Sequence, residues 1–208
     1  MSNIKKFDIY AKPPLRFPGD AVGTFGGVKG RVRFFNAESG ETLYQRDNVI
    51  CNGISYLFSQ MMTSNTSIVS GVWGLAVGAG GTAPLWSPTQ QPDPLPTQTA
   101  MVSEIKRKAL SQIQFLDTNG NPTLTWTTTV SFQTILNATT DNISTPIREM
   151  GLIGGGSSAV PSNMLTAPYF TPAAPVLNSV VLINYITIPA FILPNSVNMG
   201  VDWVLSFA

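Results

Sequence analysis

Alternating apolar and polar positions recur along the chain, and this period of two predicts β-strands. The segment from Val197 to Phe207 has an apolar residue at nearly every second position, so one face of this strand is expected to lie in a core. Segments 69–78 and 180–188 are further apolar runs of strand length. The pattern therefore predicts a fold built mainly from strands.

The first predicted hairpin joins segments 29–36 and 41–48 through a turn that ends at Gly40. Successive side chains of a strand point to opposite faces, so Arg31 and Arg33 are expected to share one face. This arginine face is either a solvated surface or a docking surface, and the pattern alone leaves both interpretations open.

The second predicted hairpin joins segments 101–115 and 123–136, with Asn119-Gly120 at the tip of its turn. Alternate residues of the return strand are expected to face the core: Leu124, Trp126, Thr128, Val130 and Phe132. The turn begins like a calcium-binding loop, but its glycine is misplaced and its twelfth position is Thr128 instead of Glu. No calcium site is predicted here.

One segment has the periodicity of a helix. Asn52 can cap it, and apolar residues follow at i, i+3, i+4, i+7 and i+8: Ile54, Leu57, Phe58, Met61 and Met62. We expect a short amphipathic helix that covers one end of the β core.

Two apolar segments each contain one glutamate and one arginine: Glu104 with Arg107, and Glu149 with Arg148. A carboxylate buried in a sheet has to be paired, because removing one partner of a buried ion pair costs about 3–5 kcal/mol. We therefore expect both segments to lie near each other in one sheet, where the two arginines bridge the two glutamates as structural ion pairs.

Charge is distributed unevenly along the chain. The net charge is +1, yet residues 151–208 contain a single charged residue, Asp202. A free surface usually has about a quarter or more charged residues. We expect other subunits to cover this segment; a surface of Ser, Thr and Asn is the alternative interpretation.

Prolines and glycines interrupt residues 1–30, which predicts an extended N-terminal arm before a domain of residues 31–208. The arm has too many aromatic residues for a typical disordered segment, so we expect it to contact a neighbouring subunit. Asp8 and Asp20 interrupt its basic residues, and nucleic-acid binding is not expected. The expected partner contacts are Phe7, Tyr10, Arg16, Phe17 and Phe25 in the arm and Trp86 in the proline-rich segment 82–98.

The residue types limit the chemistry that the chain can perform. It has no histidine and one cysteine, Cys51, so Ser-His-Asp and Cys-His arrangements, imidazole metal ligands and an intrachain disulfide are all excluded. Glu104 and Glu149 could form a glycosidase-like pair, but ion pairing explains each of them. No enzymatic activity, cofactor or metal is predicted. With no secretory or membrane-spanning segment in the sequence, we expect synthesis in a cytoplasm.

Five motifs occur in a fixed order: Asn52-Gly53 at the helix start, Gly74–Pro84, Glu104-Ile105-Lys106-Arg107, Ile147–Ile153 and a final strand with Trp203. Over about residues 50–208 this order resembles bacteriophage virion proteins of the tail-fibre and tail-collar type. The resemblance implies a domain that attaches a fibre to the tail or plugs a symmetric collar. The chain differs from long fibres because it has no repeat.

Together these features predict a mainly β fold: an antiparallel β-sandwich, jelly-roll-like, with one short covering helix and an extended N-terminal arm. The expected function is that of a structural virion subunit in tail, baseplate or fibre attachment, synthesised in the host cytoplasm. It would form homo-oligomers and contact other virion proteins, with no membrane. The alternatives are a capsid decoration (cement) protein and a receptor- or carbohydrate-binding module in which Trp86 is an exposed stacking platform.

Overall fold

The computed structural model describes residues 27–63, 71–87, 91–155, 165–166, 180–195 and 197–207. Most of the expected arm lies outside these residues. The first strand begins at Val28, so the last residues assigned to the arm belong to the sheet.

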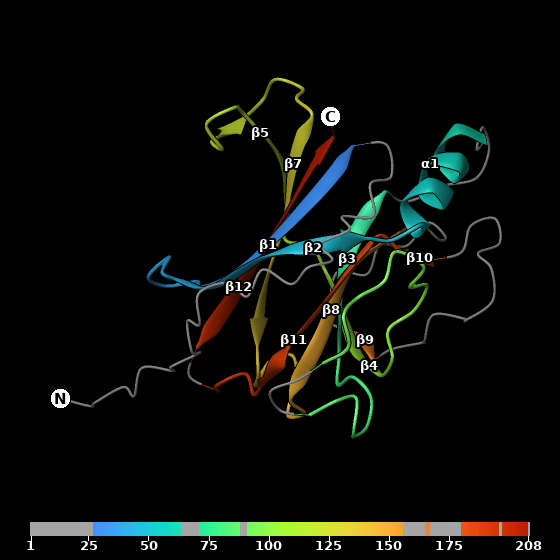
Figure 1. Cartoon of the computed structure of the whole chain (residues 1–208). Coiled ribbons are helices and arrows are strands. Elements are labelled where there is room, and N and C mark those ends of the chain that lie inside the picture. Colours follow the sequence, from blue (N-terminus) through green and yellow to red (C-terminus); the bar gives the residue numbers. More distant parts are fainter. Residues whose placement is uncertain are drawn as a thin grey trace.

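The described chain is mainly β, which confirms the predicted fold class (Figure 1). Its strands are β1 (Val28–Asn36), β2 (Thr42–Ile50), β3 (Val72–Gly78), β4 (Glu104–Ala109), β5 (Gln112–Leu116), β6 (Pro122–Thr123), β7 (Thr129–Asn137), β8 (Ile147–Gly155), β9 (Leu165–Thr166), β10 (Val180–Leu182), β11 (Asn184–Phe191) and β12 (Asn198–Phe207). One helix is described, α1 (Gly53–Thr63). No helix within the described ranges has the length and apolar character needed to span a membrane.

Antiparallel pairing connects the strands in the order β6-β5-β7-β12-β1-β2-β11-β8-β3-β4-β9, with β10 also paired to β8. The sheet folds from one layer to the other between β2 and β11, where Asn184 pairs with Ile50 and Tyr185 with Val49. One layer of the resulting β-sandwich therefore contains β5, β7, β12, β1 and β2, and the other contains β11, β8, β3 and β4 (Figure 1).

The main core lies between the two layers. Val32 and Trp203 enter it from the first layer and Leu75 and Leu152 from the second, each at most 1% exposed. The buried indole of Trp203 donates a hydrogen bond to Asn48 Oδ1 over 2.9 Å, so its polar group is satisfied. The alternation predicted for the last strand is confirmed, because four of its apolar residues are buried: Met199, Val201, Trp203 and Leu205.

The predicted strand 101–115 is divided between the layers. β4 pairs with β3 in the second layer, and β5 pairs with β7 in the first. Between them the Leu110 amide donates to the Trp73 carbonyl, and the Ser111 amide donates to the Gln133 carbonyl. The chain therefore turns from one layer to the other, as strands do at the corners of a sandwich.

The core-facing positions predicted at Leu124, Trp126 and Thr128 are wrong, because all three residues are exposed. Phe115 of β5 has Thr123 on one side and Val130 on the other, so the intervening residues cross the end of β5. A segment that crosses a strand end cannot extend the neighbouring strand. Leu124 and Trp126 are consequently 102% and 87% exposed, and the core strand β7 begins at Thr129.

The predicted helix is confirmed as α1, and it packs against β10 and β8. Gly53 allows its first turn to approach the sheet, since a Cβ there would lie 1.9 Å from the Leu182 carbonyl oxygen. Ile54 and Leu57 are buried beneath the helix.

Asp117 organises the turn between β5 and β6. Its Oδ1 accepts hydrogen bonds from the amides of Asn119 and Asn121, each 2.8 Å long. These bonds, above all the one from the Asn121 backbone, lower the pKa of Asp117 below its ordinary value. The residues that look like the start of a calcium loop therefore form a hydrogen-bonded turn.

Because the folded-state pKa of Asp117 is the lower one, these bonds are fully present above the ordinary pKa of 3.8 and are lost as the pH falls through the folded value. In an NMR titration, the amide resonances of Asn119 and Asn121 should shift with a midpoint below 3.8. Asp117→Asn should remove this transition. A midpoint at or above the ordinary value would contradict the assignment.

Candidate functional site

Glu149 lies on β8, between β3 and β11, and is fully buried. Its Oε1 accepts hydrogen bonds from the amides of Gly80, at 3.1 Å, and Ser103, at 2.8 Å. Its Oε2 accepts from the Val102 amide, at 3.0 Å, and from the Tyr185 hydroxyl. An ionised carboxylate has about four lone-pair sites, so these four donors leave Glu149 none with which to act as a base on a substrate.

Three of the four donors belong to the two ends of one long connection, the 79–103 loop between β3 and β4. Gly80 is near its start, and Val102 and Ser103 are at its end. The Ala79 amide also donates to the Ser103 carbonyl over 2.8 Å. Glu149 therefore holds the two ends of this loop together, at what we call its neck.

Two further hydrogen bonds hold the body of the 79–103 loop to the fold. The Thr187 hydroxyl donates to the Pro92 carbonyl over 2.9 Å. The Asn52 amide donates to the Pro96 carbonyl over 2.8 Å. The described part of the loop thus lies on its own chain and not on a neighbouring one.

Trp86 packs over the first turn of the loop. A Cβ on Gly80 would lie 2.2 Å from the Trp86 ring, and Gly80 has a φ of +70°, a conformation that favours glycine. Trp86 is only 7% exposed. The expectation that Trp86 is an exposed partner contact or stacking platform is therefore wrong, because its ring fills the space above the glycines.

A second core lies beneath this loop. Its members are Cys51, Trp73, Ala76, Met101, Ile153, Leu182 and Tyr185. Burial, followed by the negative charge of Glu149, raises the pKa of Tyr185, so its hydroxyl keeps the proton that it donates. Burial also raises the pKa of the Cys51 thiol, which makes Cys51 an inert packing residue.

Of the two expected ion pairs, the structure forms one. The Arg107 guanidinium pairs with both oxygens of Glu104, and both side chains are buried. β4 and β8 do lie in one layer, as expected, but β3 separates them. The pairing expected for Glu149 is wrong: its acceptor sites are filled by three backbone amides and a hydroxyl.

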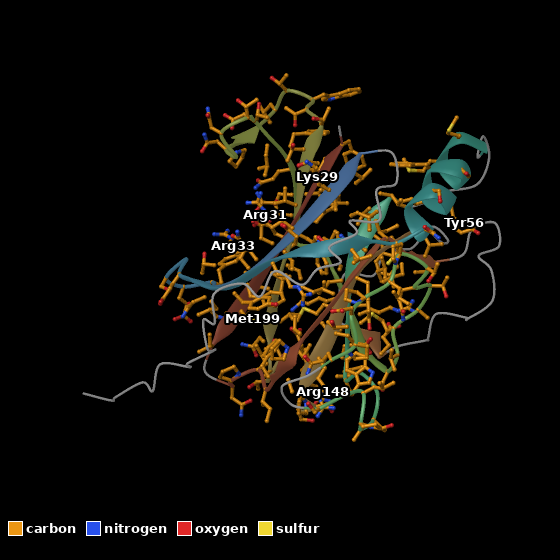
Figure 2. The ribbon with its side chains drawn as sticks, viewed as in Figure 1. Lys29, Arg31, Arg33, Tyr56, Arg148 and Met199 are labelled. Carbon is orange, nitrogen blue, oxygen red and sulfur yellow. The ribbon has the colours of Figure 1, made fainter. Side chains whose placement is uncertain are left out.

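Arg148 directly precedes Glu149, so the two side chains leave opposite faces of the strand. Arg148 lies at the lower end of the molecule in the view of Figure 2, and its Nε is buried without a hydrogen-bond partner among the described residues.

A sequence signal for the Glu149 site does exist. Segment 78–81 contains three glycines, and a Cβ on Gly78 would lie 2.4 Å from Glu149 Oε1. Glycines let backbone amides approach an anion closely. A glycine cluster together with an isolated glutamate in an apolar strand therefore indicates a carboxylate bound by backbone amides.

The arginine face predicted on β1 exists, and Arg31 on it is exposed. Figure 2 marks Lys29, Arg31 and Arg33 along this strand. Arg31 lies 3.9 Å from Asp47 with both side chains exposed, and Arg33 lies 3.4 Å from Asp202. An exposed pair such as Arg31 with Asp47 contributes about 0–1 kcal/mol, whereas Asp202 is largely buried and also accepts a hydrogen bond from the Ser131 hydroxyl.

The remaining expected partner contacts lie outside the described residues: Phe7, Tyr10, Arg16, Phe17 and Phe25. Sequence reasoning missed the exposed apolar residues that the structure does describe. Three groups stand out among them: Leu85 and Leu95 on the 79–103 loop, Leu124 and Trp126 in the connection between β6 and β7, and Phe58, Met61 and Met62 on α1. These residues are the candidate contact surfaces of the described chain.

Among the described residues no group of three or more His, Cys, Asp or Glu side chains could hold a metal ion. Comparison with known proteins adds no assignment: no protein-family model and no curated protein matches the chain.

Glu149→Ala should destabilise the protein strongly. It leaves three amides and the Tyr185 hydroxyl without their acceptor, and each unsatisfied buried donor costs about 1–3 kcal/mol. We expect the free energy of unfolding in urea to fall by at least about 3 kcal/mol. Glu149→Gln should also be destabilised, because its amide group turns a donor towards other donors.

Glu41→Ala is the matched control, because Glu41 is an exposed glutamate beside the turn between β1 and β2. Its unfolding free energy should change by no more than about 0.5 kcal/mol. Equal effects of the substitutions at Glu149 and Glu41 would mean that Glu149 does not hold the loop.

Proposed function

We propose that the chain is a structural subunit of a bacteriophage virion, in tail, baseplate or fibre attachment, which acts through contacts between subunits. The observation that carries this proposal is the pair of exposed apolar side chains, Leu124 and Trp126, in one short connection at the edge of the sandwich.

This connection is held in place although its apolar side chains are exposed. The Thr127 hydroxyl donates to the Leu116 carbonyl over 2.8 Å, and the Phe207 amide donates to the Thr128 carbonyl over 2.8 Å. Tryptophan is enriched among the residues that contribute most to protein–protein binding. A tryptophan on a fixed connection loses little conformational entropy on binding, which favours a contact with a protein partner.

The 79–103 loop offers a second surface of the same kind. Leu85 and Leu95 are 67% and 57% exposed on a loop that Glu149 and Trp86 hold against the sheet. Protein-binding residues are often placed on loops that a rigid scaffold positions. Two such surfaces on one small domain suit a subunit with more than one neighbour.

The order of motifs that resembles tail-fibre and tail-collar proteins is a second support for the proposal. Three of the residues that carry it, Glu104, Arg107 and Glu149, make structural contacts in this chain. The likeness therefore supports a shared way of building the domain, and the contact surfaces have to support the function.

Two alternatives use the same surfaces. A capsid decoration protein would bind the head through them. A receptor- or carbohydrate-binding module would use Trp126, which is 87% exposed, as the stacking ring in place of the buried Trp86.

Peptide mass spectrometry on separated heads and tails of the parent phage tests the location. The proposal expects peptides of this chain in the tail fraction. Peptides in the head fraction would favour the decoration protein. Complete absence from purified particles would overturn a virion role, and binding of the isolated chain to sugars or cells would then favour the receptor module.

A double variant tests the surface itself. Leu124→Ser with Trp126→Ser should leave the free energy of unfolding within about 0.5 kcal/mol of the native value, because both residues are exposed. Its incorporation into particles should nevertheless fall at least about tenfold if the pair contributes 1.4 kcal/mol or more to assembly.

Ile192→Ser is the control for this variant, since Ile192 is an exposed apolar residue beyond β11, 59% exposed. It should be incorporated normally. Normal incorporation of the double variant as well would show that Leu124 and Trp126 are not the assembly surface.

A further inference from the structure

The apolar stripe of α1 is longer than the surface that covers it. Its first two members, Ile54 and Leu57, are buried against the sandwich. Its last three members, which we call the uncovered stripe, are exposed: Phe58 by 37%, Met61 by 52% and Met62 by 87%. The helix has no charged residue that would favour solvent at this position.

The N-terminal segment enters the fold beside this stripe. Val28, the first residue of β1, pairs with Phe207 at the end of β12. The Phe207 ring contacts the Phe58 ring, with 6.1 Å between centroids. Figure 1 shows the start of β1, the end of β12 and α1 at the same end of the molecule.

We propose that residues 1–26 of the same chain dock on the uncovered stripe of α1. They are long enough to reach it from this position: two residues span up to about 7 Å, so Phe25, two residues before Gly27, is within reach of the Phe207 and Phe58 rings. Further apolar partners for Met61 and Met62 are available along the segment, because its aromatic residues recur at Phe7, Tyr10 and Phe17.

Attachment to Val28 favours the chain's own segment over that of a second copy. A segment joined by a short linker has an effective concentration of about millimolar at its site. A second copy at micromolar concentration cannot compete with this. Aromatic rings against methionine sulfurs also make favourable contacts.

This inference is independent of the proposed function. It assigns a binding surface and its occupant within one molecule, and it uses none of the four residues from which the proposed function is argued, Leu85, Leu95, Leu124 and Trp126. It does give the aromatic residues of the arm and the exposed end of α1 to each other instead of to a neighbouring subunit.

Oxidation by dilute hydrogen peroxide measures directly how well Met61 and Met62 are shielded from solvent, because an exposed thioether is converted to the sulfoxide. We would compare the full chain with a variant that lacks residues 2–25 and quantify sulfoxide at Met61 and Met62 by peptide mass spectrometry. Both methionines should oxidise severalfold more slowly in the full chain. The buried Met150 and Met199 should stay slow in both proteins, which shows that the fold is intact.

Phe17→Ser with Phe25→Ser in the full chain should restore fast oxidation without shortening the segment. A Lys5→Ser with Lys6→Ser variant is the matched control and should keep the protection. The measurement is repeated at several protein concentrations beside sedimentation velocity, and protection that does not change on dilution of a monomer supports docking within one chain.

Two results would overturn the inference. The first result is an equal oxidation rate in the full and shortened chains, which would show that residues 1–26 do not cover the stripe. If both rates were slow, another segment, such as residues 64–70, would cover it. The second result is protection of the methionines that disappears on dilution as a dimer dissociates, which would show that a second copy of the chain covers the stripe.

Discussion

The buried carboxylate of Glu149 is the interaction on which the second layer of the sandwich depends. Its burial would be unfavourable without hydrogen bonds, and four donors supply them. Three donors are backbone amides from the two ends of the 79–103 loop, so the charge can be satisfied only when both ends are in place. The loop and the sheet therefore have to form together.

Once its neck is closed, the loop gives the sandwich a further layer. It covers the outer face of β3, β8 and β11, where Trp73, Met101 and Tyr185 form a second core. Glycines make this close approach possible: Gly78 leaves room for the carboxylate and Gly80 for the Trp86 ring. A long, proline-rich connection thereby becomes part of the folded body, and its leucines are held in fixed positions at the surface.

The sequence predicted the features that depend on local periodicity. The hairpin of β1 and β2, the helix and the core face of β12 follow from apolar spacing and turn residues, and the structure confirms them. Charge alone indicates the pair of Glu104 and Arg107, because residues three apart on a regular strand point to opposite faces. The register shift of β4 opposite Val77 and Gly78 leaves Ile105 as an extra residue, which lets the two side chains meet.

The features that depend on long-range arrangement were not predictable in this way. Alternation continues through Leu124 and Trp126, but the chain there crosses the end of β5, which only the pairing of Phe115 on both sides reveals. The sequence predicts an arginine partner for Glu149 because charged side chains can be read from it, whereas backbone amides that a distant loop brings to the carboxylate cannot. Trp86 was expected to be exposed for a related reason, since nothing local shows that glycines lie beneath its ring.

Amide hydrogen exchange of the native protein, resolved by residue, tests the central claim most directly. If Glu149 holds the loop, the amides of Gly80, Val102 and Ser103 should exchange as slowly as those of β8, because their bonds to the carboxylate open only when the second layer unfolds. Fast exchange at these three amides, beside slow exchange in β8, would show that the loop opens on its own and would contradict the account.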